Sequence, residues 1–380
     1  MIRTFLALLL MVFLTVIIAG LWGWREYQQL WETPLLNEGD EPLVINIEPG
    51  TSFRGMVSQL EAQGLTVNDW RWRLLGRLEQ PVIKSGEYQL EAVLLVPDLL
   101  VQLSKHEVIQ YPVTIIEGWT VAELLAYLQT HELLLQTPNE PLNQLQPKLL
   151  LDENPIVQLA LTAVSKHDLP FKYALEGLFL PETYYFQRGS KPTDLLKRGE
   201  RALLEVLNQQ WETYLTTYPS EQERELKNAY ELLILASIIE KETGQNAERD
   251  KISGVFHRRL ARGMLLQTDP TVIYGMGESY DGNIRRSDLE TDTAYNTYTR
   301  AGLPPTPIAL AGAAAIKAAA QPAAGDALFF VAKGDGSGGH VFSHTLNEHN
   351  RAVQQYIRTN RARLKSLRDA TEVTETQESE

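Results

Sequence analysis

The sequence contains no cysteine, which excludes disulfide bridges, zinc sites built on thiolates and cysteine nucleophiles. Basic residues are in the minority, because 35 lysines and arginines stand against 48 aspartates and glutamates, for a net charge of −13. A nucleic-acid partner requires a basic face, so this balance argues against one. The H-E-x-x-H pattern of zinc hydrolases is also absent. Carboxylates are therefore the first candidates for chemistry in this chain.

Charge is missing altogether from Phe5 to Trp24, a stretch long enough to cross a bilayer. Trp22 and Trp24 lie at its end, where interfacial aromatic residues are typical. The segment Ala19-Gly20-Leu21-Trp22 matches a signal-peptidase site poorly, so we predict an uncleaved membrane anchor at 5–24. The short tail at 1–4 favours a cytoplasmic N-terminus, with the rest of the chain outside the cytoplasm.

With 380 residues, 44% of them hydrophobic, the chain is long enough for two domains with ordinary cores. We predict an α+β fold with a linker at 25–42, a small α+β module at 43–110 and a larger mixed α+β catalytic domain at 111–367. A loop is predicted at Gln136–Pro155, and a disordered acidic tail at 368–380. The small module resembles LysM-type glycan-binding modules, and a purely structural arm is the alternative.

Periodicity and turn residues predict the main elements. Strands are expected at Val44–Ile47, Gly86–Leu90 and Val113–Ile116, and a hairpin at Leu328–Ser343. Helices are expected at Met56–Gln63, Trp70–Leu78, Pro97–Leu103, Val121–Gln129, Leu195–Tyr214, Glu221–Thr243, Arg249–Arg262, Ala309–Ala320 and Asn350–Leu367, the last of these basic. A strand, a turn, a Ser or Thr cap and a helix recur at 44–63 and 113–129, which is a weak internal repeat.

The most apolar of these helices ends in two acids. From Leu232 to Ile239 every residue except Ser237 is aliphatic, so we expect a buried helix in the middle of a domain. Gly244 would end it in the left-handed conformation. Residues two apart point in nearly opposite directions on a helix, so Glu240 and Glu242 cannot face each other.

Glu242 is the better candidate for a raised pKa. It shares its face with Leu235, Ile238 and Ile239, and it lies in the last turn, where exposed carbonyls repel an anion. A carboxylic acid that stays protonated near neutral pH can act as a general acid. The alternative is that both acids are solvated residues at the end of a helix.

Two other segments carry candidate site residues. Gln267, Thr268 and Asp269 precede Pro270, although Thr268 or Asp269 can also be a cap on a helix that begins there. The segment Leu175–Phe186 combines aromatic residues, a glycine and a proline around Glu182, which suits the wall of a sugar-binding cleft and suits core packing equally well.

Several segments together resemble the endolytic murein transglycosylases of the bacterial inner membrane, the MltG or YceG-like family. The residues that carry the resemblance are Ala236–Thr243 (ASIIEKET), Glu248–Lys251 (ERDK), Leu266–Gly275 (LQTDPTVIYG), Tyr295–Tyr298 (YNTY), Gly302–Pro305 (GLPP) and Gly338–Phe342 (GGHVF). The likeness covers nearly the whole chain, is dense between 170 and 355 and is weak in 25–110.

The resemblance implies cleavage of the β-1,4 bond after N-acetylmuramic acid within a glycan strand, which leaves a 1,6-anhydro end. It places the catalytic acid on the second Glu of the E-K-E-T motif, Glu242, and leaves Glu240 as a supporting residue with a nearby positive partner. Our candidates for binding the glycan are Gln267, Thr268, Asp269, Tyr274, Asn296, Tyr298 and Glu182. No cofactor or metal is implied. The expected partners are peptidoglycan strands and, through the anchor in the bacterial plasma membrane, the cell-wall synthases.

Two competing readings remain. His340, His344 and His349 with Asp335 could form a metal hydrolase site, since His340 and His344 would share one face of a strand. A membrane-anchored glycan-binding scaffold without activity is the other.

Overall fold

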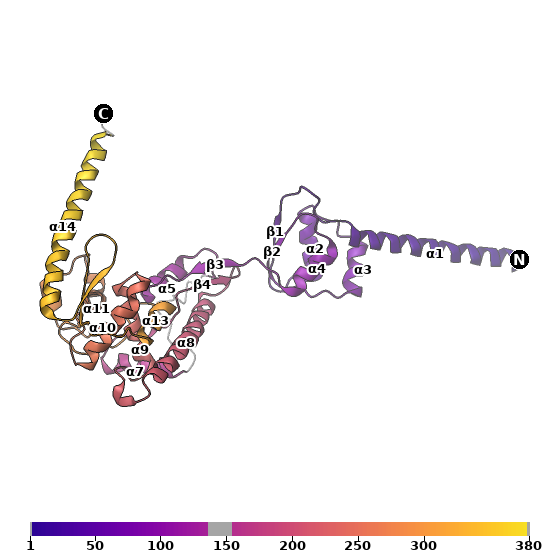
Figure 1. Cartoon of the computed structure of the whole chain (residues 1–380). Coiled ribbons are helices and arrows are strands. Elements are labelled where there is room, and N and C mark those ends of the chain that lie inside the picture. The colour runs from indigo at the N-terminus through magenta and orange to yellow at the C-terminus, as the bar shows by residue number, and fades with distance from the viewer. Residues whose placement is uncertain (1, 136–153, 378–380) are drawn as a thin grey trace. The chain divides into compact units, whose positions relative to one another are not determined.

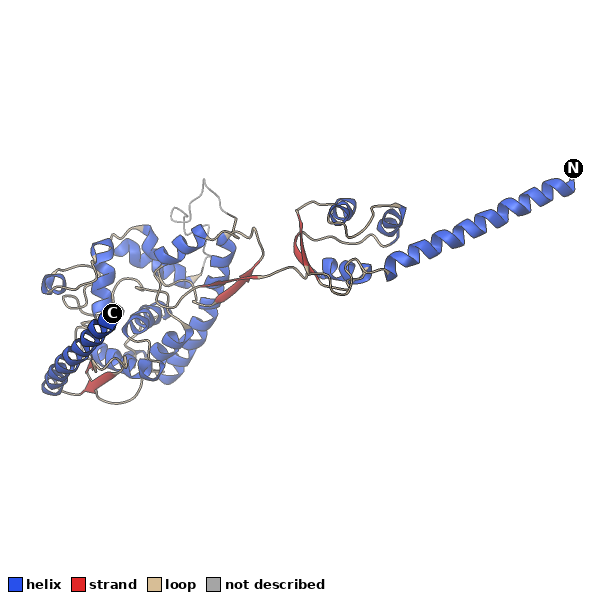
Figure 2. Ribbon diagram, turned by 90° about the horizontal axis from the view of Figure 1, so that it is seen from above, coloured by secondary structure: helices blue, strands red, loops and turns tan. Residues whose placement is uncertain are grey.

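The computed structural model describes residues 2–135 and 154–377, so the predicted loop at 136–155 lies outside the described residues up to position 153 (Figure 1). The chain divides into two compact units. Unit 1 comprises Met1–Pro112 with Tyr185–Ser190, and unit 2 comprises Val113–Tyr184 with Lys191–Glu380. Both units are dominated by helices, with short two-stranded sheets (Figure 2).

Unit 1 is a strand–helix–helix–strand unit with one further helix and the N-terminal helix. Its elements are α1 (Ile2–Glu32), β1 (Leu43–Ile47), α2 (Phe53–Ala62), α3 (Trp70–Leu78), β2 (Gly86–Leu90) and α4 (Val96–Lys105). The strands are antiparallel, with Leu43 opposite Leu90. The side chains of Ser52 and Asp69 cap α2 and α3. The core gathers the inward face of each element around Trp72 and Tyr88, both fully buried. The likeness to LysM modules stays a prediction.

The N-terminal helix α1 is long and apolar enough to cross a membrane, by length and composition. Its N-terminal part extends away from the rest of unit 1 (Figure 1). Its last turns, by contrast, place Tyr27 and Leu30 in the core of unit 1. The linker predicted at 25–42 is therefore wrong for its first part, because packing of these two side chains keeps 25–32 helical.

Unit 2 is a mostly helical domain with two short sheets of two strands each. Its elements are β3 (Tyr111–Thr114), α5 (Val121–Thr130), α7 (Pro155–Lys166), η2 (Phe171–Leu175), β4 (Thr183–Phe186), α8 (Pro192–Thr217), η3 (Glu221–Glu223), α9 (Ala229–Glu242), η4 (Asn246–Glu248), α10 (Arg249–Ala261), α11 (Asp269–Met276), η5 (Gly277–Ser279), α12 (Arg286–Glu290), α13 (Ala313–Ala320), β5 (Phe329–Ala332), β6 (His340–Ser343) and α14 (Leu346–Gln377). Strands β3 and β4 pair with each other and straddle the division between the units. The α+β class predicted from the sequence is confirmed.

Helix α9 lies at the centre of unit 2, as the sequence predicts. It packs against α7, α8, α10, α11 and α13. Every residue from Leu232 to Ile239 is buried. Helix α13 is almost entirely alanine, and short side chains let it approach α9 closely. Each aliphatic side chain buried in this way contributes about 1.5–3 kcal/mol relative to exposure. The end of α9 is thus held in a fixed place.

Two helices, α9 and α14, differ from the prediction at their ends. Helix α9 does not begin at Glu221, because Asn228 accepts the Glu231 N–H at 2.9 Å and caps a helix that starts at Ala229. Gly244 does not adopt the left-handed conformation; Thr243 leaves the helix in an extended conformation instead. The acidic tail predicted to be disordered is helical as far as Gln377, because α14 continues into it and adding residues to an existing helix is easier than starting one.

Candidate active site

Glu242 is the last residue of α9, and as a whole it is half-buried. One oxygen, Oε1, accepts a short hydrogen bond from the hydroxyl of Thr268. Burial raises the pKa of Glu242 to about 7, and the negative charge of Asp269 raises it further, while the Thr268 bond and the positive charge of Arg259 oppose the shift. The raised pKa predicted for this residue is therefore confirmed. At neutral pH this carboxyl group can both give and take a proton.

The hydroxyl of Thr268 can bond to Glu242 because it does not cap its own helix, α11. It occupies the N-cap position of α11, with extended backbone angles, but its side chain makes no capping bond. The predicted capping role of Thr268 or Asp269 is therefore wrong: Asp269 is the first helical residue, and the Thr268 hydroxyl turns to Glu242. The Thr268 N–H donates to the hydroxyl of Thr297 at 3.1 Å, which holds the cap residue in place.

The loop before Thr268 has a strained conformation that a buried arginine supports. Gln267 has a φ of +53°, in the left-handed region that non-glycine residues rarely adopt. Its N–H donates to the carbonyl of Thr297 at 3.1 Å. From α10, Arg259 Nη1 donates to the carbonyls of Leu265 and Leu266, at 3.1 and 2.8 Å. These bonds fix the backbone that aims Thr268 at Glu242.

Asp269 and Tyr298 form a polar pair on the exposed side of this group. The Tyr298 hydroxyl donates to Oδ1 of Asp269 at 2.5 Å. Asp269 is exposed and Tyr298 is half-buried. Burial, this bond and the charges of Asp269 and Glu242 raise the pKa of Tyr298, so it remains a neutral donor. The structure thus brings four of the predicted residues together, namely Glu242, Thr268, Asp269 and Tyr298.

The other predicted residues lie differently. Gln267 is exposed, and its side-chain oxygen is 3.4 Å from Arg259 Nη1. Asn296 is buried, and its amide nitrogen donates to backbone carbonyls, including that of Thr291 at 2.6 Å. Tyr274 donates to Glu176 at 2.9 Å. Glu182 is exposed just before β4. Among the described contacts, none joins Asn296, Tyr274 or Glu182 directly to Glu242.

Glu240 points to the other side of α9 and has a structural environment. Its Oε1 lies 2.9 Å from Nη2 of Arg249, and its Oε2 accepts the N–H of Gly312 at 3.0 Å. Gly312 is the N-cap of α13, so this carboxylate ties the end of α9 to the start of α13. The positive partner predicted for Glu240 is confirmed as Arg249.

Glu176 is a second buried carboxyl group, and the sequence did not single it out. It accepts the Val121 N–H at 3.0 Å and the Tyr274 hydroxyl at 2.9 Å. Burial raises its pKa to about 7, against the opposing effect of these two bonds. It links the first turn of α5 to α11. Its position before Gly177 was the only signal for it in the sequence. Arg259 gave no signal beyond a charge on an otherwise apolar helix face.

The histidines do not gather into one site. His340 Nδ1 lies 2.8 Å from Glu248, and His344 Nδ1 lies 2.6 Å from Asp326. His349 stacks on Phe329. Among residues 2–135 and 154–377 no three His, Asp or Glu side chains lie close enough to hold a metal ion together. A metal hydrolase site would need His340 and His344 to bind the same metal ion. Because each of them bonds to a different carboxylate, the arrangement does not favour a metal hydrolase.

Comparison with known proteins places the chain in a family. The sequence model of the YceG-like family matches residues 45–355, which include both buried carboxyl groups and the Thr268 loop. The chain belongs to the YceG-like family.

Relatives of this YceG-like chain carry one name. A Bacillus subtilis (strain 168) protein named endolytic murein transglycosylase is 42% identical over 186 residues, which are 49% of this chain and 49% of the relative. A protein of the same name from Streptococcus pneumoniae (serotype 2, strain D39) is 26% identical over 365 residues, which are 91% of this chain and 64% of the relative. The chain thus spans about half of the first relative's length and less than two thirds of the second's.

Among solved structures, a YceG-like protein of Listeria monocytogenes, lmo1499, is similar to this chain. The two are 26% identical, and the match covers 82% of this chain and 99% of the other with a TM-score of 0.47.

Proposed function

We propose that this YceG-like protein is an endolytic lytic transglycosylase of peptidoglycan, with Glu242 as its acid and base. The observation that carries the proposal is the Glu242 carboxyl at the end of α9, held by the Thr268 hydroxyl and with its pKa raised by burial to about 7. About half of such a group is protonated at neutral pH, so it can serve in both protonation states. The names of the relatives support the reaction class. The substrate is a glycan strand, cleaved at the β-1,4 bond between N-acetylmuramic acid and N-acetylglucosamine.

The reaction needs one carboxyl group and no water. Protonated Glu242 gives its proton to the glycosidic oxygen, and the bond from this oxygen to C1 of the muramic acid residue breaks. The 6-hydroxyl oxygen of the same sugar forms a bond to C1 and closes the anhydro ring. Its proton passes to the Glu242 carboxylate, which restores the acid. Ordinary glycosidases need a second carboxyl group to activate water or to attack C1, and this route does not.

The neighbours of Glu242 divide between two roles. Asp269 and Tyr298, on the exposed side, are our candidates to contact the sugar, with Asp269 opposing the positive charge that develops at C1. The exposed Gln267 side chain is a further candidate to contact the sugar. Glu182 also remains a candidate, although no described contact joins it to Glu242. Thr268 orients the Glu242 carboxyl and stabilises its charged form. We assign a structural role to Tyr274 and Asn296. The Tyr274 hydroxyl donates to Glu176, and the Asn296 amide donates to backbone carbonyls.

We propose that α1 anchors the chain in the bacterial plasma membrane, with the N-terminus in the cytoplasm and unit 2 outside. An anchored enzyme stays close to glycan strands as they leave the membrane. In that position the cut would end the growth of a strand, and the cell-wall synthases would be its partners.

The test is mass spectrometry of products from uncrosslinked glycan strands incubated with the full chain in detergent. We expect anhydro-ended fragments, formed equally with EDTA. Glu242→Gln keeps the size of the side chain and removes the acid, so product should fall by about 10²–10⁴-fold. The exposed Glu278→Gln makes the same chemical change away from the site and should retain activity.

Each other outcome has a definite meaning. Fragments with ordinary reducing ends would show that water attacks C1, and the lytic assignment would be wrong. Unchanged activity in Glu242→Gln would remove Glu242 from the reaction. No product from the unaltered chain, with binding to the strands intact, would support the scaffold reading.

A further inference from the structure

Helix α14 carries a strip of positive charge in an acidic chain. Between Asn350 and Leu367 there are five basic residues and no acidic one, whereas the whole chain has a net charge of −13. Arg358, Arg361 and Lys365 follow Arg351 by seven, ten and fourteen residues. Spacings of seven and fourteen are close to whole turns of a helix and ten is about a quarter turn short of one, so the four side chains lie on one side of the helix, within about 80° of each other. We call these four residues the basic strip.

The basic strip faces solvent. All four of its residues are exposed, and no ion pair found in the described part of the chain involves them. The opposite side of α14 packs on the hairpin of β5 and β6, where Tyr356 and Asn360 contact the turn at Gly334. The fold therefore uses one side of the helix and leaves the charged side facing solvent, where Arg351 Nε donates to the Asn347 carbonyl of the same helix at 3.3 Å.

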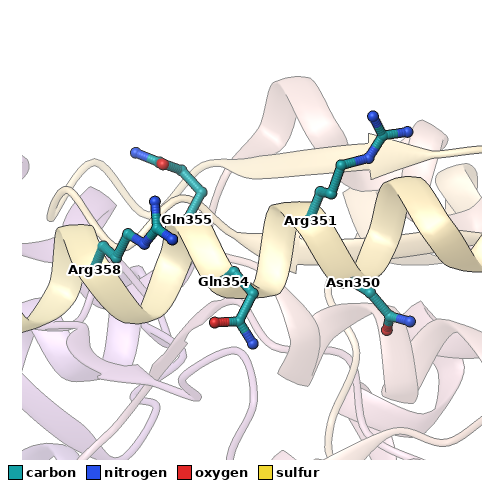
Figure 3. Close-up of a pocket in the computed structure, with 5 residues that line it drawn as sticks. All are labelled: Asn350, Arg351, Gln354, Gln355 and Arg358. Carbon is teal, nitrogen blue, oxygen red and sulfur yellow. The ribbon is translucent and has the colours of Figure 1, made fainter.

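Amide side chains extend the donor groups of the strip. Figure 3 shows a shallow open depression on α14 lined by Asn350, Arg351, Gln354, Gln355 and Arg358. The side chains of Arg351, Gln355 and Arg358 project to the same side of the helix in this view. Guanidinium groups bind phosphate oxygens in a forked geometry, and amide N–H groups add further donors. The chemistry of this surface matches a layer of phosphate groups.

Apolar side chains border the strip. Ile357 is 42% exposed and Leu364 is 50% exposed, and each lies about one turn from Arg361, on the adjoining edge of the helix. A helix with basic residues beside an exposed apolar edge is typical of one that lies on a membrane surface, where the apolar edge enters the headgroup region.

We propose that the basic strip of α14 binds the anionic phospholipid headgroups of a membrane. A bilayer is the favoured occupant because the same chain holds a helix, α1, that is long and apolar enough to span one. A second copy of α14 is disfavoured, since two such strips would repel each other. Anionic lipids attract juxtamembrane basic residues through their surface potential, and phosphate contacts add to this. The inference does not depend on the reaction at Glu242.

The absence of cysteine makes a direct test possible in the full chain. Ala362→Cys, exposed beside the strip, carries an environment-sensitive NBD fluorophore, and the protein is placed in lipid nanodiscs through α1. We expect brighter, blue-shifted emission in discs with about 30% phosphatidylglycerol than in discs of phosphatidylcholine alone. About 0.5 M salt should reverse the change, because salt screens exposed charges.

The matched variants compare equal losses of charge. Arg351→Gln, Arg358→Gln, Arg361→Gln and Lys365→Gln are combined in one variant, and Lys166→Gln, Lys191→Gln, Lys227→Gln and Lys251→Gln, all at exposed sites of unit 2, in the other. Each charge removed from the strip should weaken lipid binding roughly fivefold. Only the first variant should lose the emission change, with far-UV circular dichroism showing that both are folded.

Three results would overturn the proposal. The first is an equal response in discs with and without phosphatidylglycerol. The second is an equal loss in both variants, which would mean that only net charge matters. The third is a response to a soluble polyphosphate that exceeds the response to anionic discs, which would point to a polymer as the ligand.

Discussion

The hydrogen bond from Thr268 to Glu242 gives a prediction with an unusual sign. Thr268→Val removes the hydroxyl and nearly preserves the shape of the side chain. The Thr268 bond stabilises the carboxylate form of Glu242, so its loss should raise the pKa of Glu242 further. A hydrogen bond to a charged group contributes about 1.5–3 kcal/mol, and one pKa unit corresponds to about 1.4 kcal/mol. Taking the lower end of that range, we expect the pKa of Glu242 to rise by about one unit.

The consequence appears on the alkaline side of the pH–rate profile. The proposed first step uses protonated Glu242, so kcat/KM should stay level below the pKa of Glu242 and fall as the pH rises through it. At pH 8 about a tenth of the unaltered protein and about half of the Thr268→Val variant would carry the proton. Relative to its own plateau, the variant should then be about fivefold more active at pH 8. The assay is release of anhydro-ended fragments at several pH values.

Two further substitutions make the reasoning refutable. Thr268→Ser keeps the hydroxyl, so its alkaline limb should stay in place. Asp269→Asn removes a negative charge that raises the pKa of Glu242, so the alkaline limb of the variant's pH–rate profile should move to lower pH. This shift should be smaller than that of Thr268→Val, because Asp269 is exposed and its charge is screened by solvent. If Thr268→Val left the limb unmoved, or moved it down, the hydrogen bond would not control the acid.

Two predictions concern the support of the site. Glu240→Ala should leave the buried Arg249 without its closest carboxylate and lower the free energy of unfolding of unit 2 by about 3 kcal/mol. This corresponds to a fall of about 10 °C in Tm, measured by circular dichroism. Glu117 is the half-exposed second partner of Arg249, and an equal fall in Glu117→Ala would contradict the prediction. Gly177→Ala combines a φ of +78° with a Cβ placed 2.5 Å from the Pro307 Cβ, whereas Gly189→Ala has the same φ and nothing within 4 Å. The first should cost over about 2 kcal/mol and the second about 1 kcal/mol, so equal losses in thermal unfolding would show that no clash occurs.

In unit 1 the local sequence pattern predicted the bounds of most helices and strands well. Helix α3 and strand β2 have the predicted bounds, and α2 and α4 differ from prediction by at most three residues at either end. Caps, turns and apolar periodicity are set by residues that are close in sequence, so they can be read without knowing the fold. Where packing against another element decides, as for the last turns of α1, the local signals failed.

The sequence by itself determined that an apolar, buried helix ends in two acids, and it favoured Glu242 over Glu240 as the group with the raised pKa. The helix repeat separates the two residues, and the apolar side chains on the face of Glu242 disfavour its charged form. Burial raises the pKa of Glu240 as well, although the Gly312 N–H and the charge of Arg249 oppose the shift. Only the tertiary structure decided what surrounds Glu242. The Thr268 hydroxyl bonds to Glu242 instead of capping α11, Arg259 holds the loop, and Asn296 turns inward. The contact of Thr268 with Glu242 joins residues 26 positions apart, and each of these polar side chains had several possible partners until the fold brought the observed ones within reach.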